Sequence, residues 1–254
     1  MTRLLALMML LPSLANAQYA GWTGTGATGY GVAALGSPIT ITSGAGVGTH
    51  TTSVNTGTTG SNRVLTTSIT TSGNCASIPP DVTGVTYNGV SMTQVAYGFK
   101  TDAGCSAGVG RVYLFALAAP AIGSNNLTVT IGSNGDAGFL FYGFAQTWTG
   151  ANQTTPIRAY SSSYDVSGSQ TDTITISSST SDVLVNHACA GGGGTYITID
   201  TGQTEVFRAN GDGGSTCSSM VASTKAGTAG TGSMGMVYGS ISDWFMHMAF
   251  SVQP

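Results

Sequence analysis

Charged side chains are scarce in this chain. Of its 254 residues, 7 are Lys or Arg and 10 are Asp or Glu, which gives a formal net charge of −3. A protein that follows a nucleic-acid backbone neutralises many phosphates with Lys and Arg. The few cations present here cannot do that, so the composition excludes nucleic acid as a partner.

The chain is also poor in the residues that build helices. Gly, with 38 copies, and many Ser and Thr residues stand where a helical protein has Ala, Leu, Glu and Lys. Hydrophobic residues still make up 41% of the chain, enough for a buried core, which excludes disorder. Together these features predict an all-β fold.

No apolar run in the sequence is long enough to predict a membrane span. The longest, residues 4–11, is far below the ~20 residues that a bilayer requires, and Pro12 interrupts it. Arg3 precedes this run, and Ala15-Asn16-Ala17 follows it as a small-x-small cleavage signal. We therefore predict a signal peptide over residues 1–17, cleavage before Gln18, and a secreted or cell-surface location, extracellular or periplasmic.

Cysteine is rare but even in number, with Cys75, Cys105, Cys189 and Cys217. None of them shows C-x-x-C spacing, so a structural zinc site has little support. Export to an oxidising compartment favours disulfides, and four cysteines allow three connectivities. We favour Cys75–Cys105 and Cys189–Cys217, because each pair closes a loop of roughly 30 residues between neighbouring strands.

Turn-forming clusters of Gly, Asn, Ser and Pro recur about every 8–15 residues, with short β-branched or aromatic runs between them. This spacing predicts an antiparallel, jelly-roll-like β-sandwich that forms a single domain over residues 32–254. The expected strands are 63–70, 82–87, 92–99, 111–117, 127–131, 139–148, 173–177, 183–189, 205–208 and 243–252.

Two of these strands differ in pattern from the last one. Residues 112–115 and 139–142 are apolar at every position, which predicts central strands covered on both faces. In the last strand large apolar residues alternate with Asp243, His247 and Ser251. That alternation predicts a half-buried strand of an outer sheet.

Five motifs follow one another along the chain: SNRVL (61–65), VTGVTYNGVSMT (82–93), VYLF (112–115), NNLTVT (125–130) and GANQTTP (150–156). In this order they resemble a diffuse family of Gly/Thr/Ser-rich β-sandwich modules of secreted bacterial and phage-associated proteins. The resemblance covers roughly residues 30–254 and implies the sandwich fold, but no catalytic residues. The chain departs from the family pattern at Thr66, Thr67 and Ser68, where a bulkier apolar strand is expected.

The sequence patterns that could indicate catalysis lack the structural context that catalysis requires. Gly104-Cys105-Ser106-Ala107-Gly108 matches the G-x-S-x-G motif of hydrolases, but a strand is expected after it where a nucleophile elbow needs a helix. Glu205 is the single glutamate, which leaves few ways to assemble an acid–base pair. We therefore predict that the protein is not an enzyme and needs no cofactor.

Metal ligation has no clear pattern either. The three histidines, which show no ligand spacing, are His50, His187 and His247. Asp136 and Asp212 lie in Asn-Gly-Asp turns, where local hydrogen bonds explain them, although such turns could also coordinate calcium. The prediction is no metal site.

Two groups of aromatic residues are candidates for binding. Tyr160 and Tyr164 lie in a Ser-rich segment expected to be a loop, beside Asp165, where they could stack on and hydrogen-bond a sugar; loop packing is the alternative. The segment 18–31 is a Gly/Thr-rich, flexible stretch that carries the second group, Tyr19, Trp22 and Tyr30. These rings could lie on the protein's own sandwich or reach a neighbouring copy by strand addition.

Two functions remain open. The first is a secreted, non-catalytic module for binding or adhesion to a glycan or surface polymer. The second is a self-associating structural subunit of a surface filament or virion appendage, which low charge and numerous sheet edges would permit.

Overall fold

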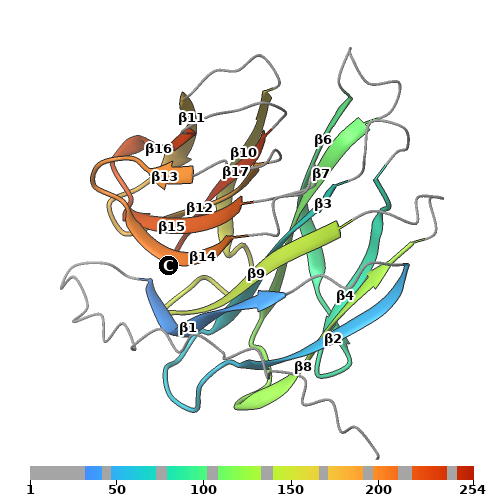
Figure 1. The fold of residues 1–254 in the computed structure, drawn as a ribbon. Coiled ribbons are helices and arrows are strands. Elements are labelled where there is room, and N and C mark those ends of the chain that lie inside the picture. The colour runs from blue at the N-terminus through green and yellow to red at the C-terminus, as the bar shows by residue number, and fades with distance from the viewer. Residues whose placement is uncertain are drawn as a thin grey trace, which may run out of the picture.

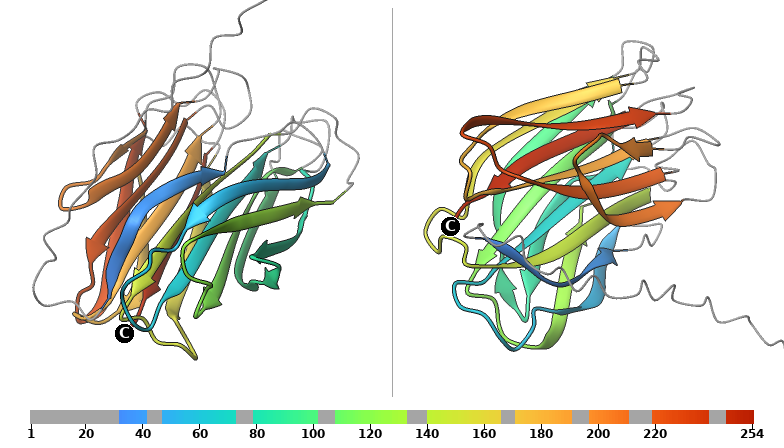
Figure 2. Two further views of the ribbon diagram at one scale, coloured as in Figure 1. Left: turned by 90° about the horizontal axis from the view of Figure 1, so that it is seen from below. Right: turned by 90° about the vertical axis from the view of Figure 1, so that its left-hand side faces the viewer.

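The computed structural model describes residues 32–41, 47–72, 79–101, 108–132, 140–165, 171–190, 197–210, 219–238 and 245–254. These residues contain no helix, and their strands form four antiparallel sheets. The predicted all-β antiparallel sandwich is therefore confirmed. The sheets stack in four layers, with two inner sheets facing each other and one outer sheet on either side (Figures 1 and 2).

The first half of the chain forms one inner and one outer sheet. Inner sheet 1 has the order β1 (Ala33–Ile41), β9 (Leu140–Thr149), β3 (Val64–Ser72), β7 (Gly108–Ala118) and β6 (Thr93–Thr101). Outer sheet 1 has the order β2 (Gly48–Asn55), β8 (Ser124–Ile131), β4 (Val82–Tyr87) and β5 (Val90–Ser91). Successive strands pass back and forth between these two sheets, as in a jelly roll.

The second half repeats this arrangement. Inner sheet 2 has the order β10 (Ile157–Asp165), β17 (Phe245–Val252), β12 (Val183–Ala190), β15 (Ser219–Ala226) and β14 (Thr204–Asn210). Outer sheet 2 has the order β11 (Thr171–Ser178), β16 (Gly230–Tyr238) and β13 (Ile197–Ile199). If β5 is left out and the remaining strands of the two halves are matched in chain order, the two inner sheets have the same strand order, and so do the two outer sheets.

Irregularities in the sheets repeat as well. The register of β6 against β7 shifts between Gln94 and Ala96, and that of β14 against β15 shifts between Glu205 and Phe207. Contacts across the two inner sheets are reciprocal, because β1 contacts β14 and β6 contacts β10. The sandwich predicted for residues 32–254 therefore consists of two structural repeats, 33–149 and 157–252, related by a pseudo-two-fold axis.

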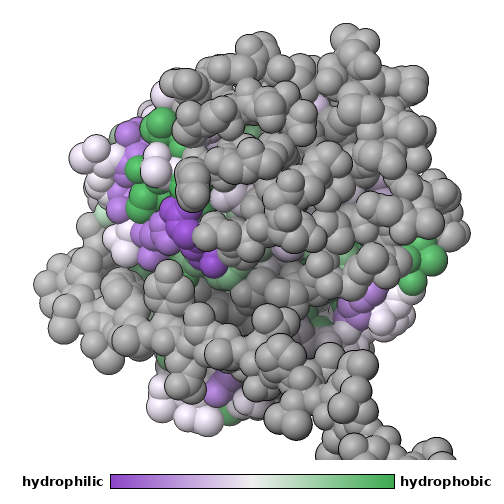
Figure 3. Space-filling model, in the orientation of Figure 1, coloured by the Kyte–Doolittle hydropathy of each residue, from purple (hydrophilic) through white to green (hydrophobic). Residues whose placement is uncertain are grey.

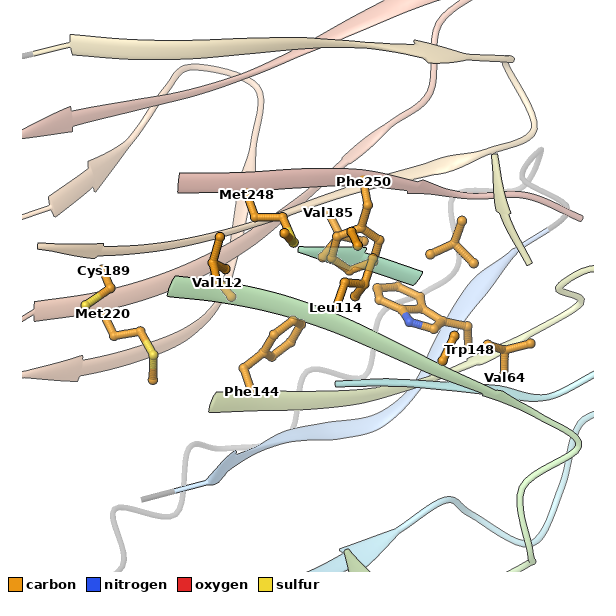
Figure 4. Packing of buried hydrophobic residues seen from close by; sticks show 14 of the residues in the cluster. Val64, Val112, Leu114, Phe144, Trp148, Val185, Cys189, Met220, Met248 and Phe250 are labelled. Carbon is orange, nitrogen blue, oxygen red and sulfur yellow. The ribbon is translucent and has the colours of Figure 1, made fainter. Parts of the chain in front are cut away.

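A central core holds the two repeats together. Val64, Leu114, Phe144 and Trp148 of inner sheet 1 belong to one buried cluster with residues of inner sheet 2 (Figure 4). The second repeat contributes Val185, Cys189, Met220, Met248 and Phe250. Burial of each large apolar side chain contributes about 1.5–3 kcal/mol, so this interface stabilises the molecule as a whole. Each outer sheet closes further apolar clusters against its own inner sheet.

Strand β3 crosses the middle of inner sheet 1 with a polar sequence, and all nine of its residues are buried. Hydrogen bonds make this possible. The Trp148 Nε1 donates to Thr66 Oγ1 over 2.8 Å, and the Thr71 hydroxyl donates to the carbonyl of Pro80 over 3.0 Å. Thr66, Thr67 and Ser68 depart from the family pattern, but the strand is still deeply buried. Their polar groups have partners inside the core.

Strand β17 alternates as predicted, but it is not half-buried. It lies between β10 and β12 in inner sheet 2, and every residue from Phe245 to Val252 is buried. Its polar side faces outer sheet 2, where the Ser251 hydroxyl donates to the carbonyl of Ser177 over 3.1 Å. The prediction of an outer-sheet strand was wrong because His247 and Ser251 use their polar groups inside a second core, not in solvent.

The two apolar strands are placed as predicted. Residues 112–115 belong to β7, which pairs with β3 and β6, and 140–142 belong to β9, which pairs with β1 and β3. Both lie in inner sheet 1, which is covered on one face by outer sheet 1 and on the other by inner sheet 2. The Ser- and Thr-rich strands β2, β10 and much of β16 carry no comparable apolar signal, and the sequence did not predict them.

Candidate functional site

Strand β6 forms one edge of inner sheet 1 and carries two exposed aromatic rings. Tyr97 is 43% exposed and Phe99 is 41% exposed. Their partners on β7 are Tyr113 and Arg111, and directly paired residues share one face of a sheet. This face is the one toward outer sheet 1, which ends in the two-residue strand β5 and leaves the rings uncovered.

The rings of Tyr97 and Phe99 lie next to each other with nearly parallel planes, and the pair is here called the aromatic platform. Their planes differ by 9° and their centroids lie 6.4 Å apart. The platform is supported from inside, because the guanidinium carbon of Arg111 lies 4.9 Å from the Phe99 centroid and the ring of Tyr113 lies 5.1 Å from that of Tyr97. The two rings are thus held in place by side chains behind them.

The charge behind the platform is compensated. Arg111 forms an ion pair with Asp81, and the Tyr113 hydroxyl donates to Asp81 Oδ1 over 3.0 Å. Burial raises the pKa of Tyr113 to about 12, against a smaller lowering by Arg111, and burial also raises the pKa of Tyr97. Both phenols are therefore neutral at ordinary pH and present hydroxyl groups rather than charges.

A cavity of about 200 Å³ lies on the other side of the β6 edge, where β6 meets β10. Its lining residues are Gly98, Phe99, Ser162, Ser163, Tyr164 and Met246. Gly98 permits the close approach of the strands, since a Cβ there would lie 2.5 Å from Ser162 Oγ and 3.0 Å from Val112 Cγ1. Phe99 belongs to the platform and also lines the cavity, so the two lie at the same place on the β6 edge, on opposite faces of inner sheet 1.

The structure places the predicted binding residues Tyr160 and Tyr164 on strand β10, not in a loop. Tyr160 pairs with Phe250 and Tyr164 with Met246, so both tyrosines lie on the face toward inner sheet 1. Tyr164 lines the cavity, and Tyr160 is 51% exposed. The loop prediction was wrong because this segment is an edge strand, where the three serines between the two tyrosines tolerate solvent.

The third predicted binding residue, Asp165, is the last residue of β10 and pairs with Phe245. The sequence analysis missed Tyr97, Gly98 and Phe99. Their i, i+2 spacing within a predicted strand indicates a shared face for the two rings, but not whether that face is covered.

Two buried histidines lie near this region without forming a catalytic group. His247 Nδ1 lies 2.6 Å from Asp172 Oδ2, and the Ser163 hydroxyl donates to Asp172 Oδ1 over 3.0 Å. The serine thus points to the carboxylate and not to the imidazole that would activate it. His187 is fully buried, and desolvation lowers its pKa to about 3, which keeps it neutral.

Several predicted residues lie outside the described part of the chain. They are Tyr19, Trp22, Tyr30, Cys75, Cys105, Ser106, Asp136, Asp212 and Cys217. Cys189 is buried in β12 and is not a free thiol. The other three cysteines lie outside the described residues, so the disulfide connectivity stays a prediction.

On the face drawn in Figure 3, the described residues that can be seen form small strongly hydrophilic patches beside small hydrophobic ones. Within the described ranges, no three His, Cys, Asp or Glu side chains gather as metal ligands would. The same residues include no helix of the length and apolarity needed to cross a membrane.

Comparison of the chain with known protein families, curated proteins and solved structures gives no match.

Proposed function

We propose that this protein is a secreted or cell-surface binding module, without catalytic activity, that holds a neutral glycan at the β6 edge. One observation carries the proposal: the Tyr97 and Phe99 rings are exposed and nearly parallel, and they lie at the same strand edge as a cavity lined by uncharged residues. A pyranose has apolar C–H faces and a rim of hydroxyls. The rings would stack on the faces, and the cavity would receive part of the rim.

The electrostatics of the site favour an uncharged ligand. Arg111, whose guanidinium lies against the platform, is paired with Asp81 and covered by Phe99. The residues that line the cavity are all uncharged. An anionic sugar would have to lose water without gaining a compensating charge, whereas a neutral sugar exchanges hydrogen bonds with hydroxyl groups.

The rigidity of the site supports binding as its purpose. Tyr97 and Phe99 lie on a strand, and both rings rest on side chains that are themselves packed or ion-paired. Binding therefore costs little side-chain ordering, which is the main cost that weakens contacts at exposed loops. Export to the cell exterior rests on the predicted signal peptide, residues 1–17.

A glycan array with the purified protein tests the proposal. We expect neutral glycans to bind, and Tyr97→Ala or Phe99→Ala to weaken binding at least about tenfold, equivalent to about 1.4 kcal/mol. Ile122→Ala is the control, because Ile122 is 59% exposed but lies on the connection between β7 and β8. Binding unchanged by both ring substitutions, or no glycan bound at all, would contradict the proposal.

A further inference from the structure

We infer that the glycan is an extended, β-linked glucose chain that runs along the seam between the two repeats. The seam is defined here as the line where β6 of inner sheet 1 meets β10 of inner sheet 2. The inference rests on the proposed function and extends it, because the platform and first cavity cover only one end of this line.

A second cavity, of about 390 Å³, lies at the other end of the seam. Thr93 and Val95 line it from β6, Ile157 lines it from β10, and Thr154 and Thr155 line it from the connection between the repeats. The lining combines hydroxyl groups with aliphatic side chains and contains no charged residue. Its chemistry therefore matches that of the first cavity.

The two cavities are aligned because β6 and β10 run in the same direction past each other. Gly98 and Ser162 line the first cavity, whereas Thr93 and Ile157 line the second. Five residues of extended strand span about 16 Å, the length of a short linear oligosaccharide. Tyr160 lies between the cavities on β10, half-exposed, on the face toward inner sheet 1.

The shape and charge of this line identify the occupant. A straight path with an aromatic ring between two uncharged cavities fits a flat, extended chain with apolar faces and equatorial hydroxyls, which is the form of a β-linked glucan. An α-linked glucan coils and would leave the line after one or two sugars. Absence of charged lining residues in both described cavities disfavours an acidic polysaccharide.

The pseudo-equivalent seam, between β14 and β1, differs from this one at the position of the platform. By register, Thr204 of β14 matches Thr93, and Arg208 takes the place of Tyr97. Arg208 Nη2 lies 2.6 Å from Glu205 Oε2, so an intrastrand ion pair stands where the platform has an aromatic ring. We therefore expect one glycan chain per protein, and Thr204 provides a matched control position for Thr93.

Isothermal titration with cello-oligosaccharides, from the disaccharide to the hexasaccharide, tests the inference. Affinity should rise about tenfold or more with length until both cavities are filled, and malto-oligosaccharides of equal length should bind more weakly. Thr93→Trp places a large ring at the exposed mouth of the second cavity. It should abolish the gain of affinity with length, whereas Thr204→Trp should leave that gain intact.

Three results would each overturn the extended-chain inference. The first is an affinity that does not depend on oligosaccharide length, and the second is an equal effect of Thr93→Trp and Thr204→Trp. The third is a protein that binds glycans on the array but does not bind cello-oligosaccharides. The proposed function would survive those results if Tyr97→Ala still weakened binding of the array glycans. If the unmodified protein binds no glycan at all, the proposed function itself is contradicted. Circular dichroism of each variant distinguishes a blocked site from a misfolded chain.

Discussion

Ser68 and His187 occupy equivalent positions in the two repeats, and their side chains meet, with Ser68 Oγ 2.7 Å from His187 Nδ1. The equivalence follows from register. Val64 pairs with Ala118 and Trp148, just as Val183 pairs with Ala226 and Val252, and the two polar residues each lie four positions later. The pseudo-two-fold axis therefore passes between Ser68 and His187, at the centre of the interface that joins the repeats.

Removal of the serine hydroxyl should destabilise this interface. Ser68→Ala would leave buried His187 Nδ1 without its partner, at a cost of about 1–3 kcal/mol in the free energy of unfolding. Urea denaturation measures this cost. Ser53→Ala on the exposed face of β2 is the control, and equal midpoints for both variants would contradict the importance of the central hydrogen bond.

Acid should weaken the protein through His187. Desolvation lowers the pKa of His187 from 6.5 to about 3 in the folded state. Between these values the unfolded chain binds a proton that the folded chain does not, so stability contributed by this group is present above pH 6.5 and is lost as the pH falls toward 3. Two pH units below 6.5, this group lowers the free energy of unfolding by about 2.7 kcal/mol, at 1.36 kcal/mol per pH unit.

Unfolding of wild type and His187→Gln at several pH values measures this contribution. Carboxylates add to the acid sensitivity of both proteins, so the difference between the two curves isolates the histidine. We expect the variant to show the shallower fall in stability between pH 6.5 and 3. Parallel curves would show that His187 takes up its proton without unfolding the chain.

Substitution of Asp182 should also destabilise the fold strongly. The Asp182 carboxylate is fully buried and accepts hydrogen bonds from Arg158 Nε over 2.7 Å and from the Ser179 backbone N–H over 3.0 Å. Asp182→Ala should lower the free energy of unfolding by about 3 kcal/mol, because the turn before β12 loses its acceptor. Asp200→Asn, at an exposed turn, should cost far less in the same denaturant titration.

Closure of the first cavity should reduce both glycan binding and stability. Gly98→Ala adds a methyl group close to Ser162 and Val112, which should reduce glycan affinity and cost about 1–2 kcal/mol of stability. Gly84→Ala in β4 is the matched control, since a Cβ there meets nothing within 4 Å. The double variant Gly98→Ala/Ser162→Gly should recover part of the stability, and failure to do so would place the clash elsewhere.

Fold class was readable from sequence because its signals are local. Turn residues and β-branched runs predicted β3 and β12 nearly in full and the middle of β7, and the alternation in β17 was correct. The repeat also has a sequence trace, since Thr93-Gln94-Val95 and Thr204-Glu205-Val206 begin equivalent strands. Such short similarity is easily overlooked in a chain built from so few residue types.

Residue burial, in contrast, was decided by tertiary structure. A polar strand such as β3 can be central only when partners from other strands satisfy its hydroxyls, and Trp148 lies 82 residues from Thr66. Likewise, the side of β17 that carries His247 is buried because β11 brings Asp172 to it. The pattern of one strand records its alternation, but not the sheets that cover it.

The candidate site shows the same division. The sequence by itself determined that this chain forms short antiparallel strands with aromatic residues at alternating positions, because backbone preference and turn chemistry act over a few residues. Only the tertiary structure decided that Phe99 of β6 and Tyr164 of β10 line one cavity and that Tyr97 remains exposed. The physical reason is that exposure and proximity depend on how the two repeats pack about their pseudo-two-fold axis, an arrangement set by the shared core and not by any single strand.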